Sequence, residues 1–205
     1  MKKFNILTYL PRALSMDYRA LAFLRVSVGI LVLVDLIRRA SDFSSHYTES
    51  GIFSNLQSTL ADNLIIPSLF LISDAGWWQA TLFIVMGVLA ILLIVGYRTR
   101  ITTLILWYLV LSLQLANPYI TNRGDLELLV LLFWGIFLPW DRLFSIDYAD
   151  HKPPQYQTIF TAATVAYVLQ IGYIYYFAFI HKCQSAVWCQ DFSAIHYAFS
   201  IDAYA

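Results

Sequence analysis

Charged side chains are scarce in this sequence. Asp, Glu, Lys and Arg make up 13% of its 205 residues, whereas soluble domains usually carry about 25%. The 13 basic residues balance the 13 acidic ones, so the chain has no positive field that would attract nucleic acid. We therefore expect no nucleic-acid partner, and a soluble globular protein is a poor match to this composition.

Side chains that bind metals or form disulfides are also few. The four histidines are scattered and no HxxxH or CxxC spacing occurs, so we predict no bound metal. The two cysteines, Cys183 and Cys189, could form a disulfide in an oxidising compartment. A spacing of six residues on one helix would point them to different faces, which argues against the bridge.

Long apolar runs are what the sequence has in abundance. Hydrophobic residues make up 60% of the chain and the mean hydropathy is +0.64. About 20 apolar residues in a helix cross a membrane core, and hydrocarbon offers bare peptide groups no other partner. We predict one all-α domain over residues 1–205, a polytopic transmembrane bundle with about five spans, surrounded by membrane lipids. The predicted spans are Ala20–Ile37, Trp77–Val95, Ile101–Ala116, Leu126–Pro139 and Thr158–Ile180.

The basic residues favour one orientation of these spans. Short loops rich in Lys and Arg stay on the cytoplasmic side. A cytoplasmic N-terminus places on that side Lys2, Lys3, Arg12, Arg19, Arg98, Arg100, Arg142 and Lys152. The opposite side then holds Arg38, Arg39, Arg123 and Lys182. We predict a cytoplasmic N-terminus, although Arg38 and Arg39 oppose it.

The predicted outer loop Ala40–Gly76 is long for a passive connector. Its second half, NLIIPSLFLISDAGWW, is apolar and is interrupted by Pro67. This pattern predicts an interfacial or re-entrant segment. The alternative is a lid that covers the ends of the helices.

Two ionisable residues, Arg25 and Asp35, fall within the first predicted span. Ionisable groups at membrane depth usually face the interior of a bundle. Asp35 can pair with Arg38 or Arg39 within one helical turn, either as a structural ion pair or in a functional role. Arg25 lies about 15 Å from Asp35 by helical rise, so it needs another partner or an anionic ligand.

The predicted topology brings titratable residues from three separate segments to the outer face. They are His46, then Asp125 and Glu127, and finally His181 and Lys182. Lys182 follows the aromatic turns GYIYYFAFI. Partial burial there would remove hydration from its ammonium and favour the free amine, which could act as a general base. The alternative is a lysine that extends to the lipid headgroups.

An ordered set of motifs resembles the horizontally transferred transmembrane (HTTM) domain, which includes the vitamin K-dependent γ-carboxylases. The set covers nearly the whole chain: LRVSVGILVLVDLIRR, Tyr47 and Gly51, GYRTR, ANPYITNRGD, FLPWDRLFSID and YYFAFIHKCQSAVW. In the carboxylase branch, a helix of the form Tyr–Phe–x–Ala ends in a catalytic lysine a few residues before a tryptophan. Tyr175, Ala178, Lys182 and Trp188 resemble that pattern, with one extra residue between lysine and tryptophan.

This resemblance implies a membrane-embedded enzyme that modifies or matures a secreted peptide or small protein at the extracytoplasmic face. It would use a reduced, vitamin K-like quinone with oxygen and carbon dioxide, and Lys182 would be the general base. His181 and His46 would assist, and Asp125 or Glu127 would orient the base. The candidate residues for binding the quinone are Tyr173, Tyr175, Tyr176 and Phe177, with Arg25 as a further candidate.

The chain also departs from the carboxylase pattern. Gly124 and Asp125 stand where that branch has a histidine, and the sequence stops at Ala205, before the family's later helices, as expected of a short member or a fragment. A second branch is equally similar: the membrane component that matures a bacterial peptide toxin of the sporulation-delaying type, with arginine where Lys182 stands. It implies a bacterial cell membrane and a soluble maturation partner. The alternative to an enzyme is a membrane scaffold, chaperone or immunity component for a secreted peptide.

Overall fold

The computed structural model describes residues 11–200 except 12, 49–66, 119 and 152–156. The chain forms two compact units, residues 16–159 and a second unit made of residues 1–15 with 160–205. Each unit is described by itself. Predictions for Lys2, Lys3, Arg12, Gly51, residues 63–66 and Lys152 fall outside the described residues.

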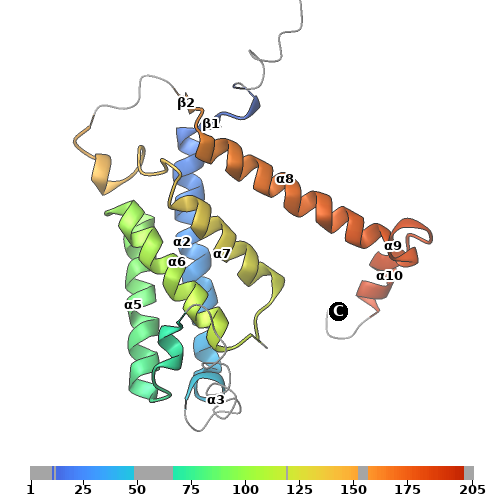
Figure 1. The fold of residues 1–205 in the computed structure, drawn as a ribbon, viewed down its shortest axis with the longest axis horizontal. Coiled ribbons are helices and arrows are strands. Elements are labelled where there is room, and N and C mark those ends of the chain that lie inside the picture. The colour runs from blue at the N-terminus through green and yellow to red at the C-terminus, as the bar shows by residue number, and fades with distance from the viewer. Residues whose placement is uncertain (1–10, 12, 49–66, 119, 152–156, 201–205) are drawn as a thin grey trace, which may run out of the picture. The chain divides into compact units, whose positions relative to one another are not determined.

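The first unit is a ring of four helices, which Figure 1 shows side by side. They are α2 (Tyr18–Ser41), α5 (Gly76–Val95), α6 (Thr99–Ala116) and α7 (Arg123–Gly135). Each helix packs on the next, and α7 returns to α2. The helices α2 and α5 approach closely at Gly29, where an added Cβ would lie 3.1 Å from the carbonyl oxygen of Ala90. Small residues commonly allow this approach between membrane helices.

Four described helices are long and apolar enough to cross a membrane: α2, α5, α6 and α8 (Ala162–Cys183), the last in the second unit. They confirm helices at four of the five predicted spans. The last of these begins later than predicted, because Thr158–Ile159 form strand β2 and Thr161 caps α8. The side-chain oxygen of Thr161 accepts from the backbone N–H of Thr164, and Thr164 caps in return. Such a capping box fixes the start of a helix.

The predicted span Leu126–Pro139 corresponds to α7, which has thirteen residues. Its length is about 20 Å by helical rise, less than the roughly 30 Å of a membrane core. The backbone continues to turn after the helix, and the N–H of Leu138 donates to the carbonyl of Trp134. The ring of Trp140 then fills the space beside Gly135, where any larger side chain would overlap it. Among the described residues, four helices are thus long enough to cross a membrane, and the fifth crossing stays a prediction.

The last part of the long loop, residues 67–75, lies against the bundle. It contains the 3-10 helix η1 (Leu69–Leu71) and follows the short helix α3 (Phe43–Tyr47). The side chain of Ser112 accepts from the N–H of Leu69, and Tyr108 donates to the carbonyl of Pro67 at 2.7 Å. Tyr108 lies about 12 Å before the end of α6 by helical rise. Side chains of α6 thus form hydrogen bonds with the backbone of this loop, and the interfacial or re-entrant segment stays a prediction beside the lid.

A two-residue strand pair joins the ends of the first unit. Strand β1 (Met16–Asp17) immediately precedes α2, and it pairs in antiparallel register with β2 (Thr158–Ile159). A second 3-10 helix, η2 (Ile146–Tyr148), lies in the chain before β2. The strand pair therefore places the start of α2 next to the residues that lead into α8.

The second unit contains α8 and two short helices, α9 (Ala186–Cys189) and α10 (Ala194–Phe199). Cys183 and Cys189 form a disulfide, with Cα atoms 5.0 Å apart. The sequence argument against this bridge assumed one continuous helix. That assumption is wrong, because α8 ends at Cys183 and a turn separates it from α9.

Candidate functional site

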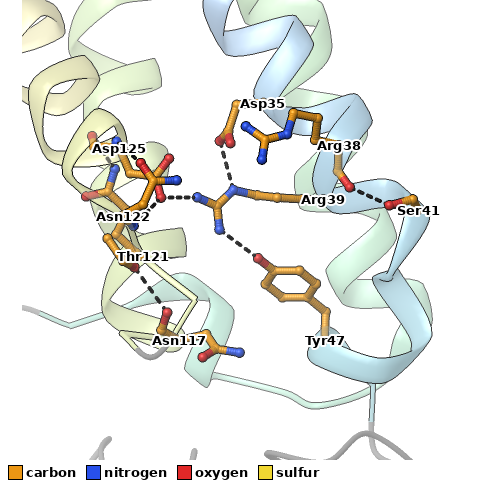
Figure 2. A network of polar contacts seen from close by, with 10 residues as sticks. Asp35, Arg38, Arg39, Ser41, Tyr47, Asn117, Thr121, Asn122 and Asp125 are labelled. Atoms are coloured by element: carbon orange, nitrogen blue, oxygen red, sulfur yellow. Dashed lines mark hydrogen bonds and ion pairs between the residues drawn. The ribbon is translucent and has the colours of Figure 1, made fainter. Parts of the chain in front are cut away.

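The guanidinium of Arg39, near the end of α2, joins three segments of the first unit (Figure 2). Its Nε lies 2.8 Å from Oδ2 of Asp35, and its Nη2 lies 2.8 Å from Oδ2 of Asp125 at the start of α7. Its Nη1 donates to the hydroxyl of Tyr47 in α3 at 3.1 Å. The ion pair predicted for Asp35 is confirmed, with Arg39 as its partner. We call Asp35, Arg39, Tyr47 and Asp125 the Arg39 cluster.

The motif NRGD explains why a carboxylate stands at this position. Asn122 caps α7: its Oδ1 accepts from the N–H of Asp125, and Asp125 Oδ2 accepts from the N–H of Asn122 at 2.8 Å. An acidic residue in the first turn of a helix also interacts favourably with the helix dipole. The backbone carbonyl of Asp125 accepts from Gln114 of α6. The same side chain therefore starts α7 and binds Arg39.

Burial makes the Arg39 cluster sensitive to the loss of any member. The side chains of Arg39 and Asp125 are 8% and 7% exposed, and that of Asp35 is 21% exposed. A buried ion pair that loses one partner leaves an uncompensated charge away from water. Burial also raises the pKa of Tyr47, although Arg39 acts in the opposite direction. Tyr47 is therefore a neutral hydroxyl at physiological pH.

Two adjoining cavities of about 300 Å³ each flank the Arg39 cluster. The first, the polar pocket, is lined by Asp35, Arg38, Arg39, Ser41, Asp42, His46, Tyr47, Ile120 and Asn122. The second, the groove, is lined by Leu31, Val34, Asp35, Arg38, Asn122, Gly124, Asp125, Glu127, Leu128 and Leu131. The cavities share Asp35, Arg38 and Asn122. Of the predicted site residues, His46 lines the polar pocket, and Asp125 and Glu127 line the groove.

Lys182, the predicted general base, belongs to the second unit together with His181. Its Nζ lies 4.5 Å from the centre of the Trp188 ring. The disulfide beside it ties the segment that carries Trp188 to the end of α8. The approach to Trp188 has the geometry of a cation–π contact, which holds the side chain of Lys182 against the tryptophan ring. The predicted group of five catalytic residues is thus divided between two separately described units.

The predicted quinone-binding aromatics also lie on α8. Tyr173 and Tyr176 line a hollow of about 490 Å³ formed by this helix, together with Val168, Leu169 and Gly172. Tyr173 stacks on Phe177, with ring centres 6.2 Å apart. Tyr175 is not among the lining residues of the hollow. An apolar hollow with aromatic walls suits a planar ring, and quinone binding stays a prediction.

Arg25 lies at the other end of the first unit and is fully buried. Its Nη2 donates to the carbonyl of Phe144, and its guanidinium fills the space beside Gly96, where a Cβ would overlap it. The expectation of a partner other than Asp35 is thereby confirmed: it is a backbone carbonyl of the FLPWDRLFSID motif. Within the described part of the chain, Nε and Nη1 of Arg25 have no hydrogen-bond partner.

Asp147 in the same motif binds the turn between α5 and α6. Its carboxylate accepts from the N–H groups of Arg98 at 2.8 Å and Thr99 at 3.0 Å. Sequence reasoning missed this cap and the pairing of Arg39 with Asp125. The spacing of Asn122 and Asp125 resembles a capping box and could have indicated where α7 begins, but it carried no signal for the pairing with Arg39.

No protein-family model, no curated protein and no solved structure matches this chain. Its function therefore has to be inferred from the geometry of its own residues.

Proposed function

We propose that the chain is a membrane protein with five crossings. Strands β1 and β2 pair, so residues 17 and 158 lie on one side of the membrane, and the chain between them must cross an even number of times. Helices α2, α5 and α6 supply three crossings. The fourth falls to α7 with the turns after it, and α8 is the fifth.

Contacts at both ends of α7 support this count. Near its start, Asp125 pairs with Arg39 close to the end of α2. After its end, Asp147 binds the backbone of Arg98 and Thr99 between α5 and α6. The segment thus leads from one end of the bundle to the other. Trp140 and the turn at Leu138 add length that the helix itself lacks.

The disulfide supports a cytoplasmic N-terminus. Disulfides persist in oxidising compartments outside the cytoplasm, so the end of α8 at Cys183 is extracytoplasmic. Five crossings then place the start of α2 in the cytoplasm. They place the end of α2, with Arg39, on the extracytoplasmic side.

We propose that the polar pocket binds a polar segment of a secreted peptide, and the lining of the pocket carries this proposal. Its ionisable side chains are two guanidinium groups, two carboxylates and the imidazole of His46. A simple anion or cation would meet like charges there, whereas a peptide backbone offers donors and acceptors side by side. The ion pairs and hydrogen bonds of Arg39 hold the pocket in shape before binding, which lowers the ordering cost.

Photo-crosslinking tests the peptide proposal. A photoreactive residue is placed at Ile120, which lines the polar pocket, and at Ile146, an exposed residue in the segment bound near Arg98. We expect a secreted peptide to crosslink at Ile120 and not at Ile146. The synthetic peptide should give the same adduct in proteoliposomes. Equal crosslinking at both positions contradicts the proposal.

An enzyme is the second candidate, because the Trp188 contact and the neighbouring disulfide hold the Lys182 amine in a defined place. The resemblance to the vitamin K-dependent carboxylases adds a reduced quinone, whose ring suits the hollow beside Tyr173 and Tyr176. Catalysis would require the ammonium to leave the tryptophan ring and lose its proton. Extraction of the purified protein tests this candidate: a bound quinone supports it, and a protein whose activity is indifferent to added quinone rejects it.

A further inference from the structure

Two helical stripes face each other across the groove. On α2 the lining residues are Leu31, Val34, Asp35 and Arg38, and on α7 they are Gly124, Glu127, Leu128 and Leu131. Both sets have the i, i+3, i+4, i+7 spacing that marks one face of a helix. The two helices run in opposite directions, because Arg39 near the end of α2 pairs with Asp125 near the start of α7. Charged residues therefore gather at one end of the groove and leucines and valine at the other.

The apolar end of the groove is open at the side of the bundle. Leu31 is 50% exposed and Val34 is 48% exposed, although both belong to a helix of spanning length. In a membrane such side chains contact hydrocarbon. Leu31 and Arg38 are about 10 Å apart along the helix by rise. The change from apolar to charged over this distance follows the order of acyl chain and headgroup in a phospholipid.

Among the described residues that line the charged end of the groove, one cation and one anion have no ion-pair partner. Asp35 and Asp125 are bound to Arg39. Within the described residues, the side chains of Arg38 and Glu127 have no ion-pair partner. Arg38 can bind a phosphate through two parallel N–H groups, and Glu127 can accept hydrogen bonds from an ammonium. A ligand that carries both groups satisfies both residues.

We infer that the groove between α2 and α7 binds a phospholipid with an ethanolamine headgroup. Its phosphate pairs with Arg38, its ammonium with Glu127, and an acyl chain lies along Leu31, Val34 and Leu131. A lipid that is purely anionic leaves Glu127 unpaired. A choline headgroup cannot donate an N–H to the carboxylate. This inference does not depend on the peptide proposal for the polar pocket.

Lipid crosslinking in vesicles of defined composition tests the inference. A photoreactive residue is placed at Val34 in the groove and, as a matched control, at Val88 of α5, which is 51% exposed. The vesicles contain phosphatidylethanolamine, phosphatidylcholine and the anionic lipid phosphatidylglycerol in equal amounts. We expect ethanolamine lipid to be enriched about threefold among adducts at Val34, the size of one exposed charge pair. Adducts at Val88 should follow the bilayer composition.

Three results overturn the inference: the same lipid distribution at both positions, enrichment of the anionic lipid at Val34, or a peptide adduct at Val34 in native membranes. The last of these assigns the groove to a peptide.

Charge-neutral variants identify the two headgroup contacts separately. Glu127→Gln should abolish the preference for ethanolamine over choline lipid while leaving total lipid crosslinking at Val34 unchanged. Arg38→Gln should reduce crosslinking of all phospholipids. Arg38→Lys keeps the positive charge but not the two parallel N–H groups, so it should restore only part of the crosslinking. The controls Arg100→Gln and Asp150→Asn alter exposed charges outside the groove and should change neither readout. Retention of the ethanolamine preference in Glu127→Gln overturns the assignment.

Discussion

The guanidinium of Arg39 and the carboxylate of Asp125 lie 2.8 Å apart, and both side chains are more than nine-tenths buried. Arg39 lies near the end of α2, and Asp125 lies in the first turn of α7. Arg39 lines the polar pocket and Asp125 lines the groove. Their ion pair therefore holds the boundary between the two cavities in place. Both proposed binding sites therefore depend on this ion pair.

Asp125→Asn should destabilise the first unit strongly. The substitution keeps an oxygen that can cap α7, but it removes one of the two carboxylates that compensate Arg39. Loss of one partner from a buried ion pair costs about 3–5 kcal/mol. Thermal unfolding in detergent measures the effect. Glu127→Gln on the same helix is the matched control, and it should unfold at the wild-type temperature because Glu127 is exposed. Equal unfolding temperatures for the two variants would contradict a structural role for Asp125.

Tyr47→Phe should destabilise the protein less than Asp125→Asn. The ring stays in its buried position, but Arg39 Nη1 loses the hydroxyl that accepts its hydrogen bond. An unsatisfied buried donor costs about 1–3 kcal/mol. Tyr97→Phe, at an exposed tyrosine, is the control and should have no effect. If Tyr47→Phe and Tyr97→Phe have the same unfolding temperature, the hydrogen bond between Arg39 and the hydroxyl of Tyr47 does not contribute to stability.

The raised pKa of Tyr47 predicts a pH dependence at the alkaline end. Below about pH 10, both the folded and the unfolded protein keep the phenol protonated, and the hydroxyl contributes its full stabilisation. Above that pH the unfolded chain releases the proton more readily than the folded protein, so stability falls as the pH rises towards the folded pKa. Unfolding measured from pH 8 to 11 should show a steeper decline for wild type than for Tyr47→Phe. Parallel curves for the two proteins would exclude this contribution.

Gly96→Ala should disrupt the opposite end of the first unit. Gly96 has φ +81°, a left-handed conformation, and its missing side chain makes room for the Arg25 guanidinium. The backbone strain alone costs roughly 1–2 kcal/mol, and displacement of Arg25 from the Phe144 carbonyl adds to it. Gly87→Ala in α5 is the matched control, since nothing lies within 4 Å of an added Cβ there. The yield of folded protein and its unfolding temperature should fall only for Gly96→Ala.

The sequence predicted the spanning helices well because their signal is local. An uninterrupted apolar run identifies Trp77–Val95, and the structure has Gly76–Val95. The end of α8 was harder to locate, because the turn after Cys183 leaves no mark in an apolar pattern. The bridge to Cys189 depends on that turn, so an argument based on a continuous helix led to the wrong expectation.

The sites were predicted only as sets of residues. Within one helical turn, Arg38 and Arg39 were equally good partners for Asp35. Contacts with Asp125 and Tyr47, distant in the sequence, single out Arg39 and leave Arg38 exposed. Likewise, the sequence left two alternatives for Lys182, partial burial or extension to the headgroups. The structure leaves this residue exposed, against a tryptophan that lies beyond a turn. Local patterns give the type of residue, whereas its partner is decided by tertiary packing.

The five-crossing topology can be checked by labelling single cysteines with a membrane-impermeant thiol reagent. The native cysteines are joined in the disulfide and do not react. Cysteine at Ser44 in α3 should be labelled in intact cells, and cysteine at Asp150, after α7, should be labelled only once the membrane is permeabilised. Both positions are exposed in the structure. Labelling of both in intact cells would mean that α7 does not cross.

Lys182 variants distinguish an enzyme from a binding protein. Lys182 is exposed at the end of α8, so Lys182→Ala should leave no core cavity and the protein should insert normally. If the amine is a general base, maturation of the natural peptide is lost in Lys182→Ala. It is also lost in Lys182→Arg, because arginine can keep the cation–π contact with Trp188 but does not give up its proton. Activity in the arginine variant alone indicates that only the positive charge matters. Normal maturation by the alanine variant rejects the enzyme and leaves peptide binding at the polar pocket as the function.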